Sequence, residues 1–351
     1  MGIKAGENIE CVIESLAVGG RGVARVEGMA VFVDRAVPGQ RVLARVLKAK
    51  KRFAEGEVVE VLEQSPDFAE PFCPHYGECG GCQLQDTAYP RQLAEKAAQV
   101  EQTLARLGGV SFEETAEPVA SPKQRGYRNK MAFTFAGRGD DLAVGLHRRD
   151  DPRRVLDLAV CHLMDPRGVE LLHEVREFCR ASGVPSWTKG SRKGKGPTGY
   201  WRHLVLRRSE ATGRWMVHVI TAPETANQSV ANALGEMLLA EHKDVASFVH
   251  STRKAKNAVA EGERLMAAMG EPWLEERIGD VRYRIPANGF FQTNTLAAEL
   301  LYAEAVAMAQ LTGSERVLDL YCGCGGLALQ LAPHLTGKGA GVTGVEVVAE
   351  A

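Results

Sequence analysis

Long apolar runs and a strong net charge are both absent from this 351-residue sequence. No apolar run reaches the ~18 residues that a membrane helix needs, which argues against a membrane-spanning protein. Residues 1–7 contain no apolar signal core, so we expect a cytoplasmic location. The formal net charge of −1 gives no overall polyanion-binding signature. Eight cysteines in a cytoplasmic chain are more often metal ligands or buried thiols than disulfides.

Positive charge is nevertheless concentrated in short segments. Residues 35–52 contain seven Lys and Arg side chains and no acidic one. Further basic clusters lie at 123–130, 148–154 and 189–195. A single cluster can be merely a solvated face, but clustered Lys and Arg are also the footprint of phosphate binding. Four clusters in one chain therefore favour a polyanionic partner.

The pattern along the chain predicts a multidomain protein with three parts. Residues 1–64 contain short alternating strands separated by Gly and Pro turns, which predicts a small OB-like β-barrel. Residues 65–288 contain a cysteine loop, a helical pattern at 90–107 and mixed strands and helices, which indicates an α+β domain. Residues 289–351 end in strand, glycine turn, helix and strand, the opening of a Rossmann-like α/β domain.

Three cysteines lie close together in a Cys-x5-Cys-x2-Cys pattern with glycines beside the last two. They are Cys73, Cys79 and Cys82. Thiolates are soft ligands that suit zinc or an iron–sulfur cluster, and the spacing does not choose between them. His75 or His162 could complete a zinc site, and Cys161 offers a fourth thiol far downstream.

The glycine turn at residues 319–326 reads Asp-Leu-Tyr-Cys-Gly-Cys-Gly-Gly between a strand and a helix. Glu346 ends the next strand, where a carboxylate can accept hydrogen bonds from both hydroxyls of a ribose. The Gly-x-Gly-Gly spacing differs from the Gly-x-Gly-x-x-Gly fingerprint of dinucleotide sites. It favours S-adenosylmethionine over NAD, with a purely structural turn as the alternative.

Taken together, these motifs resemble the S-adenosylmethionine-dependent RNA 5-methyluridine methyltransferases, a bacterial family acting on ribosomal or transfer RNA. Residues 7–63 look like the TRAM domain of that family, an OB-like RNA-binding module. Tyr-Arg-Asn-Lys-Met at 127–131 and Gly-Leu-His-Arg at 145–148 look like its central RNA-binding domain. Phe-Phe-Gln-Thr-Asn at 290–294 and the turn at 319–323 match its cofactor motifs. The four cysteines match its cluster ligands.

The resemblance implies roles for individual residues. S-adenosylmethionine would be contacted by Gln292, Tyr321, Gly323, Gly325, Gly326 and Glu346. A [4Fe–4S] cluster would be held by Cys73, Cys79, Cys82 and Cys161. RNA would be contacted by Arg45, Lys48, Lys51, Arg128 and Lys130. Many relatives have a polar residue at position 326, so glycine there removes a side-chain contact. The RNA would be 23S ribosomal RNA, with transfer RNA as the alternative, and the protein would be a monomer.

Methylation of uridine C5 requires a nucleophile because that carbon does not react on its own. A cysteine thiolate adds to C6, C5 then attacks the methyl group, and a base removes the C5 proton. In the family this cysteine lies beyond the second strand of the cofactor domain. The sequence ends at Ala351 after two strands, whereas a doubly wound sheet usually has about five to seven. We therefore expect a truncated chain that contains no catalytic residue and does not methylate RNA alone.

Two other functions remain open. One is a non-catalytic RNA-binding protein with a structural zinc or iron–sulfur site. The other is a radical S-adenosylmethionine enzyme, since these also combine a cluster with a TRAM domain. Such enzymes use Cys-x3-Cys-x2-Cys and leave one iron open, whereas here the spacing is x5 and a fourth thiol is present. We therefore expect a closed cluster.

Overall fold

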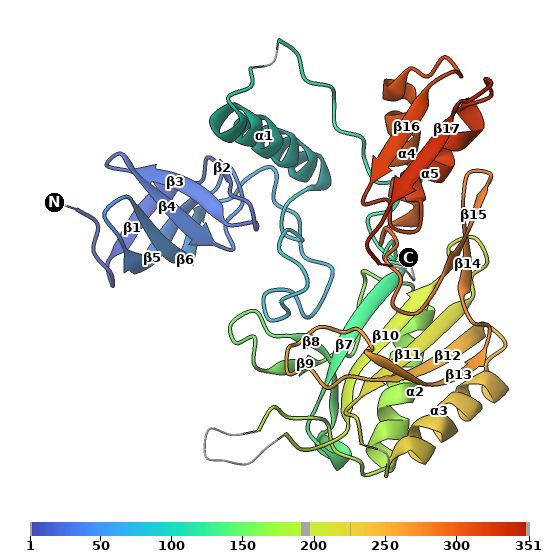
Figure 1. Ribbon diagram of the computed structural model, residues 1–351. Coiled ribbons are helices and arrows are strands. Elements are labelled where there is room, and N and C mark those ends of the chain that lie inside the picture. Colours follow the sequence, from blue (N-terminus) through green and yellow to red (C-terminus); the bar gives the residue numbers. More distant parts are fainter. Residues whose placement is uncertain (1, 112, 191–196, 225, 349–351) are drawn as a thin grey trace. The chain divides into compact units, whose positions relative to one another are not determined.

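The computed structural model describes residues 2–348 except 112, 191–196 and 225. The chain forms two compact units, Met1–Ala120 and Ser121–Ala351 (Figure 1), and each is described by itself. Arg192, Lys193 and Lys195 of the fourth basic cluster lie outside the described residues. No helix within the described ranges is long and apolar enough to cross a membrane.

The first unit begins with a six-stranded sheet in the order β1-β5-β6-β4-β3-β2. Its strands are β1 (Asn8–Val12), β2 (Ser15–Leu16), β3 (Gly22–Val26), β4 (Met29–Asp34), β5 (Arg41–Ala49) and β6 (Phe53–Glu63). All neighbours are antiparallel except β4 and β6. Alternate side chains of these strands, such as Ala24, Val31, Val33 and Val42, form one buried core. Residues 7–63 are therefore all-β, as the sequence predicts.

A close approach between two strands explains Gly56 on β6. A Cβ atom at this position would lie 2.7 Å from the carbonyl oxygen of Arg45, on the neighbouring β5. The pairing of β5 and β6 shifts register nearby, between Val46 and Lys48. Glycine therefore lets the long strands β5 and β6 bend together, since bulges and glycines are the usual means of curving a sheet.

Helix α1 (Tyr89–Gly108) follows the cysteine loop and is hydrogen-bonded to Leu16 on β2 through Glu95 and Gln99. It begins with Pro90 in the first turn and ends at Gly109, which has the left-handed conformation that glycine favours at helix ends. Its buried Glu95 accepts a hydrogen bond from the Leu16 backbone N–H at 2.7 Å and pairs with Arg91 at 2.6 Å. The helix predicted at residues 90–107 is confirmed.

The second unit is built around a seven-stranded sheet in the order β13-β12-β11-β10-β7-β8-β9. Its strands are β7 (Lys130–Ala136), β8 (Ala143–His147), β9 (Val155–Asp157), β10 (Trp201–Arg208), β11 (Trp215–Thr221), β12 (Val245–Thr252) and β13 (Arg264–Gly270). Only β11 and β12 are parallel, and α3 (Gln228–Glu241) connects them. Helices α2 (Pro166–Ala181) and α3 lie on one face of the sheet (Figure 1).

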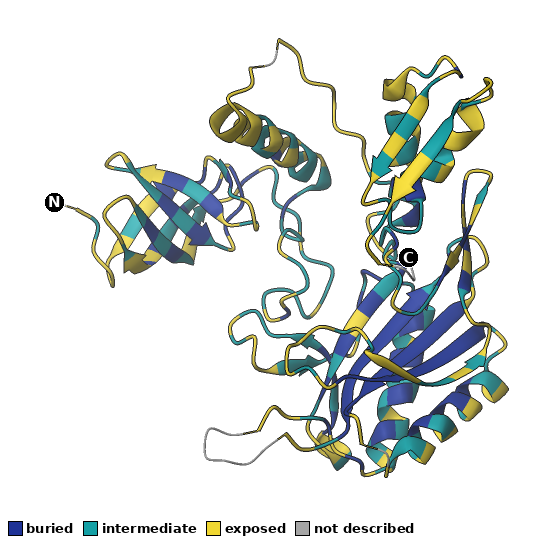
Figure 2. Cartoon of the chain, viewed as in Figure 1, coloured by how far each residue is buried: buried dark blue, intermediate teal, exposed yellow. Residues whose placement is uncertain are grey.

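Burial is greatest in the central strands β10, β11 and β12 (Figure 2). Helix α2 begins at Asp165, whose side chain accepts a hydrogen bond from the Arg167 backbone N–H, followed by Pro166. Gly235 lets α3 approach the sheet, because a Cβ atom there would lie 2.3 Å from the ring of Phe248. This packing buries the middle of the sheet on the face that α3 covers.

The remaining elements of the second unit follow the sheet along the chain. They are β14 (Leu274–Ile278), β15 (Val281–Ile285), α4 (Thr295–Ala309), β16 (Arg316–Leu320), α5 (Gly326–Leu331), a 3₁₀ helix at Ala332–His334 and β17 (Gly341–Val345). A further 3₁₀ helix, at Gly139–Asp141, lies between β7 and β8. Strands β14 and β15 form a hairpin, and β16 and β17 pair in parallel. The predicted order of strand, glycine turn, helix and strand is confirmed, whereas the hairpin was not predicted.

Candidate functional site

The glycine turn joins the end of β16 to the start of α5. Gly323 and Gly325 have positive φ angles of 53° and 78°, which glycine adopts without strain. A Cβ atom at Gly323 would meet nothing within 4 Å, so the turn presents open backbone at this point. At Gly326, by contrast, a Cβ atom would lie 2.4 Å from the hydroxyl oxygen of Tyr302. Glycine at position 326 therefore allows α5 to pack against α4.

Glu346 lies directly after β17 and contacts this turn. The Gly323 backbone N–H donates a hydrogen bond to Glu346 Oε2 at 2.9 Å. The backbone N–H groups of Val347 and Val348 both donate to Oε1 at 2.8 Å. These backbone hydrogen bonds lower the pKa of Glu346, and the bond from Val348 has the largest effect. Two parts of the predicted site, the glycine turn and the carboxylate, thus lie side by side.

The carboxylate of Glu346 keeps acceptor capacity beyond these three bonds. An ionised carboxylate has about four lone-pair positions, so one remains on Oε2 and can accept a hydrogen bond from one hydroxyl of a diol. Tyr321 precedes the glycines with a φ of 62° and is 86% exposed. Non-glycine residues rarely adopt a φ in this range, and such backbone strain is found most often at functional sites. The turn thus offers an acceptor, open backbone and an exposed aromatic ring to one ligand.

The β14–β15 hairpin supports the beginning of α5. Tyr283 on β15 donates its hydroxyl hydrogen to the Gly326 carbonyl oxygen at 3.1 Å. Gln330 Nε2 donates to the Tyr283 hydroxyl at 3.0 Å and to the Ile278 carbonyl at 2.9 Å. Cys324 packs against the same apolar cluster, and burial raises its pKa, which keeps the thiol protonated. Cys324 is therefore a packing residue of the turn.

Asn129 anchors the predicted cofactor motif at residues 290–294 to the central sheet. Its Nδ2 donates to the carbonyl oxygen of Gln292 and to Thr295 Oγ1, both at 2.8 Å. Its backbone N–H donates to the carbonyl oxygen of Thr293 at 2.8 Å. Asn129 belongs to the motif at 127–131, in which the sequence singled out only Arg128 and Lys130. The structure therefore brings two motifs together and assigns Asn129 a positioning role that sequence reasoning missed.

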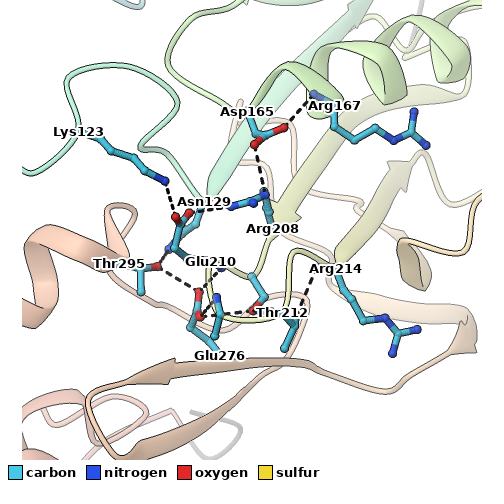
Figure 3. A network of polar contacts seen from close by, with 12 residues as sticks. Lys123, Asn129, Asp165, Arg167, Arg208, Glu210, Thr212, Arg214, Glu276 and Thr295 are labelled. Atoms are coloured by element: carbon cyan, nitrogen blue, oxygen red, sulfur yellow. Dashed lines mark hydrogen bonds and ion pairs between the residues drawn. The ribbon is translucent and has the colours of Figure 1, made fainter.

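Glu276 on β14 is fully buried and collects hydrogen bonds from three segments (Figure 3). Its donors are Thr295 Oγ1 at 3.1 Å, Glu210 N at 2.8 Å, Ala211 N at 2.9 Å, Arg277 N at 3.0 Å and Ser209 Oγ at 3.3 Å. Glu276 thereby ties the β10–β11 turn and the start of α4 to the hairpin. In the sequence Glu276 simply follows Glu275, and nothing in this context indicates that it is buried.

The residues predicted to bind RNA lie in both units. Arg45 and Lys48 on β5 and Lys51 in the following turn are exposed. Lys130 begins β7 opposite Arg207 on β10, and burial lowers the pKa of Lys130. Arg207 is 2% exposed and donates Nη2 to the Gly289 carbonyl oxygen at 2.6 Å. Buried Arg207 and half-buried Lys130 therefore lie near the segment leading to the cofactor motif.

The cysteine loop precedes α1 in the first unit. Gly81 N–H donates a hydrogen bond to Cys79 Sγ at 3.4 Å. Burial raises the pKa of Cys79, and the neighbouring thiols of Cys82 and Cys73 raise it further. Among the described residues, however, no three His, Cys, Asp or Glu side chains are arranged to hold a metal ion. Cys161 is buried in the second unit. The donor chemistry suits a soft metal, but the structure does not itself support a cluster.

Comparisons with known proteins agree with this arrangement. The family model of the TRAM domain matches residues 4–59. An uncharacterized RNA methyltransferase of Nitratidesulfovibrio vulgaris is 40% identical, covering 94% of this chain and 69% of that protein. One of Halalkalibacterium halodurans is 33% identical, covering 98% and 72%. The Pyrococcus abyssi tRNA (uracil-54, C5)-methyltransferase, solved with S-adenosyl-L-homocysteine, superposes with a TM-score of 0.70 at 26% identity, covering 96% of this chain and 72% of that one.

Proposed function

Because this chain belongs to the RNA methyltransferase family, we propose that it serves the S-adenosylmethionine-dependent methylation of uridine C5 in RNA. The observation that carries this proposal is the contact between Glu346 and Gly323, which places a carboxylate that could bind a ribose beside open backbone. The similarity to a uracil-C5 methyltransferase solved with S-adenosyl-L-homocysteine supports the cofactor and the reaction. The cofactor would supply the methyl group.

The residues of the turn would each hold a different part of the cofactor. Glu346 would accept a hydrogen bond from a ribose hydroxyl, Gly323 and Gly325 would let the backbone approach, and Gly326, which packs against Tyr302, would line the site. Exposed Tyr321 would lie against the cofactor, since an aromatic ring offers apolar contact area. Gln292 would contribute its side chain, with Asn129 fixing its backbone at 2.8 Å.

We expect Glu346→Gln to weaken the binding of S-adenosylhomocysteine by about 10- to 100-fold, since hydrogen bonds to a charged acceptor are the strong ones. The measurement is isothermal titration calorimetry on the 351-residue chain. Glu315→Gln is the matched control, because Glu315 is another half-exposed carboxylate that accepts backbone N–H bonds, from Thr312 and Gly313. It should bind the ligand as the unchanged chain does. If the Glu346 variant bound S-adenosylhomocysteine as tightly as the unchanged chain, Glu346 would not be part of the cofactor site.

The same resemblance leads us to propose Cys73, Cys79, Cys82 and Cys161 as ligands of a [4Fe–4S] cluster. Support comes from the donor chemistry, because Cys73, Cys79 and Cys82 share one loop and the Gly81 backbone N–H donates to Cys79 Sγ, as suits a cluster ligand. Four thiolates would leave no iron open, so the cluster would support the fold or position RNA and would not activate the cofactor.

Anaerobically purified protein should contain about four iron atoms and matching acid-labile sulfide per chain, as expected for a cluster held by four cysteines. Cys82→Ser should lose both, whereas Cys322→Ser should keep them, since Cys322 lies in the glycine turn. A content of one zinc and no sulfide per chain would show a structural zinc site instead of a cluster. That result would favour the non-catalytic alternative.

For the RNA we propose 23S ribosomal RNA, with transfer RNA as the alternative. Exposed Arg45, Lys48 and Lys51 would contact phosphates through the first unit. Arg128 and Lys130 would act from the second unit, where β7 places Lys130 beside Arg207. Basic residues on more than one segment suit a folded RNA, which proteins recognise largely by shape.

A further inference from the structure

Trp187 lies on top of a buried arginine in the second unit. The guanidinium carbon of Arg202 is 4.0 Å from the centroid of the Trp187 ring, a close cation–π contact. Arg202 is only 2% exposed, whereas Trp187 is partly exposed. The arginine therefore occupies the protein side of the ring, and the exposed part of the ring is turned away from it.

Both partners of this stack are held in place. The Trp187 backbone N–H donates to the Trp201 carbonyl oxygen at 2.7 Å, beside the bridge between Ser186 and Trp201. Arg202 donates Nη1 to the Arg253 carbonyl at 2.6 Å and Nη2 to the Asn257 carbonyl at 3.1 Å. An aromatic ring fixed in this way loses little conformational entropy when a ligand stacks on it.

The surroundings of the stack are positively charged. The side chain of Arg202 makes no ion pair within the described part of the chain, and its buried Nε has no hydrogen-bond partner. Exposed Lys189 follows Trp187 by two residues, and exposed Lys254 and Lys256 lie beside Arg253 and Asn257, whose carbonyl oxygens bind Arg202. Two acids oppose them: Glu263, which pairs with Arg253 at 3.5 Å, and Glu261. The excess of positive charge suits a ligand that carries phosphates.

A second tryptophan–arginine pair shows the opposite arrangement. Arg284 lies 4.5 Å from the ring centroid of Trp273, but Arg284 is exposed, so the cation lies on the solvent side of the ring. Exposed Glu271 and Glu275 flank Trp273 along the chain. An exposed arginine above the ring and acids beside it make Trp273 less suited than Trp187 to an anionic aromatic ligand.

We propose that Trp187, backed by Arg202, is a platform on which an unpaired base of the RNA substrate stacks. Stacking needs an exposed ring face, which the buried position of Arg202 leaves available, and phosphates of the same strand would approach the flanking lysines. This inference rests on the proposed RNA substrate and adds a binding residue to it.

The platform lies far from the cofactor motif. Arg202 and Arg207 stand near opposite ends of β10, about 17 Å apart at 3.3 Å per residue. Arg207 contacts Gly289, which immediately precedes the motif at 290–294. A base on Trp187 would therefore anchor the RNA at a distance from the methylated uridine.

The test is fluorescence anisotropy of a labelled, unstructured 12-nucleotide RNA with the 351-residue chain. Trp187→Ala should weaken binding about 5- to 150-fold, the range measured for removing one stacked base contact. Trp187→Phe should stay within about threefold because it keeps a ring. Trp273→Ala, the matched control, should bind like the unchanged chain. The salt dependence of Trp187→Ala should be unchanged, because that slope counts phosphate contacts.

A second readout does not depend on the alanine variant folding. RNA should quench the tryptophan emission of the unchanged chain and of Trp273→Phe, but much less that of Trp187→Phe. Equal quenching in all three proteins, or equal RNA affinity of a folded Trp187→Ala variant, would overturn the platform and leave the proposed function standing. Absence of RNA binding by the unchanged chain, with S-adenosylhomocysteine still bound, would instead refute the RNA substrate.

Discussion

Glu276→Ala should destabilise the second unit by about 3–5 kcal/mol, as expected when a buried carboxyl acceptor is removed and its donors remain. Glu276 is fully buried and accepts five hydrogen bonds, three of them from backbone N–H groups. Alanine would leave these groups unsatisfied inside the protein. The effect should exceed that of any surface substitution in the chain.

Urea denaturation followed by tryptophan fluorescence measures this effect, because all four tryptophans lie in the second unit. Glu275→Ala is the matched control, since Glu275 neighbours Glu276 on β14 and is exposed. Its stability should stay within about 0.5 kcal/mol of the unchanged chain. Because Thr295 begins α4 and bonds Glu276 at 3.1 Å, cofactor affinity should fall as well. A change below about 1 kcal/mol would mean that water replaces the carboxylate.

Acidification from pH 7 to pH 5 should destabilise the second unit by about 2 kcal/mol for each of three buried histidines. Burial lowers the pKa of His203 and of His250 to about 4 and that of His218 to about 3. Above the ordinary histidine pKa of 6.5 the rings are neutral in both states, so pH has no effect through them. Below this pKa the histidines bind protons in the unfolded chain but stay neutral in the folded chain. Stability therefore falls with pH until the pH reaches the pKa values of the folded state.

His250→Gln tests this effect, because glutamine can still bond the Thr221 hydroxyl that lies 3.0 Å from His250 Nε2. The variant should lose about 2 kcal/mol less than the unchanged chain between pH 7 and pH 5. His334→Gln is the control, since His334 is exposed and its replacement should leave the pH dependence unchanged. Urea midpoints at the two pH values provide the numbers. Identical pH dependence in the His250 variant would show that this ring is protonated in the folded chain.

Sequence reasoning succeeded where the structure is set by local pattern. Helix α1 begins at a proline and ends at a glycine, and both signals stand in the sequence. The turn after β16 and the carboxylate after β17 were found because parallel neighbouring strands end at the same edge of a sheet. The order of strand, glycine turn, helix and strand is therefore enough to predict that Glu346 lies near the glycines.

Sequence reasoning failed where long-range packing decides. The hairpin of β14 and β15 had a usable signal, alternating residues around the two-residue loop Gly279-Asp280, and it was overlooked. Glu276 had none, because its burial depends on the β10–β11 turn, which lies 65 residues earlier in the chain. The same holds for Arg202, whose burial under Trp187 depends on segments from three parts of the sequence.

Asn129 and Thr295, 166 positions apart, share one hydrogen bond that crosses the predicted domain boundary at residue 289. Recombination between relatives at this boundary would bring together an asparagine from one parent and a threonine-bearing motif from the other. A grafted cofactor segment keeps its geometry only if the recipient supplies the matching amide. Crossovers in designed chimeras of this family therefore belong near Ala120, between the two compact units, with both parents carrying the cysteines that correspond to positions 73, 79, 82 and 161.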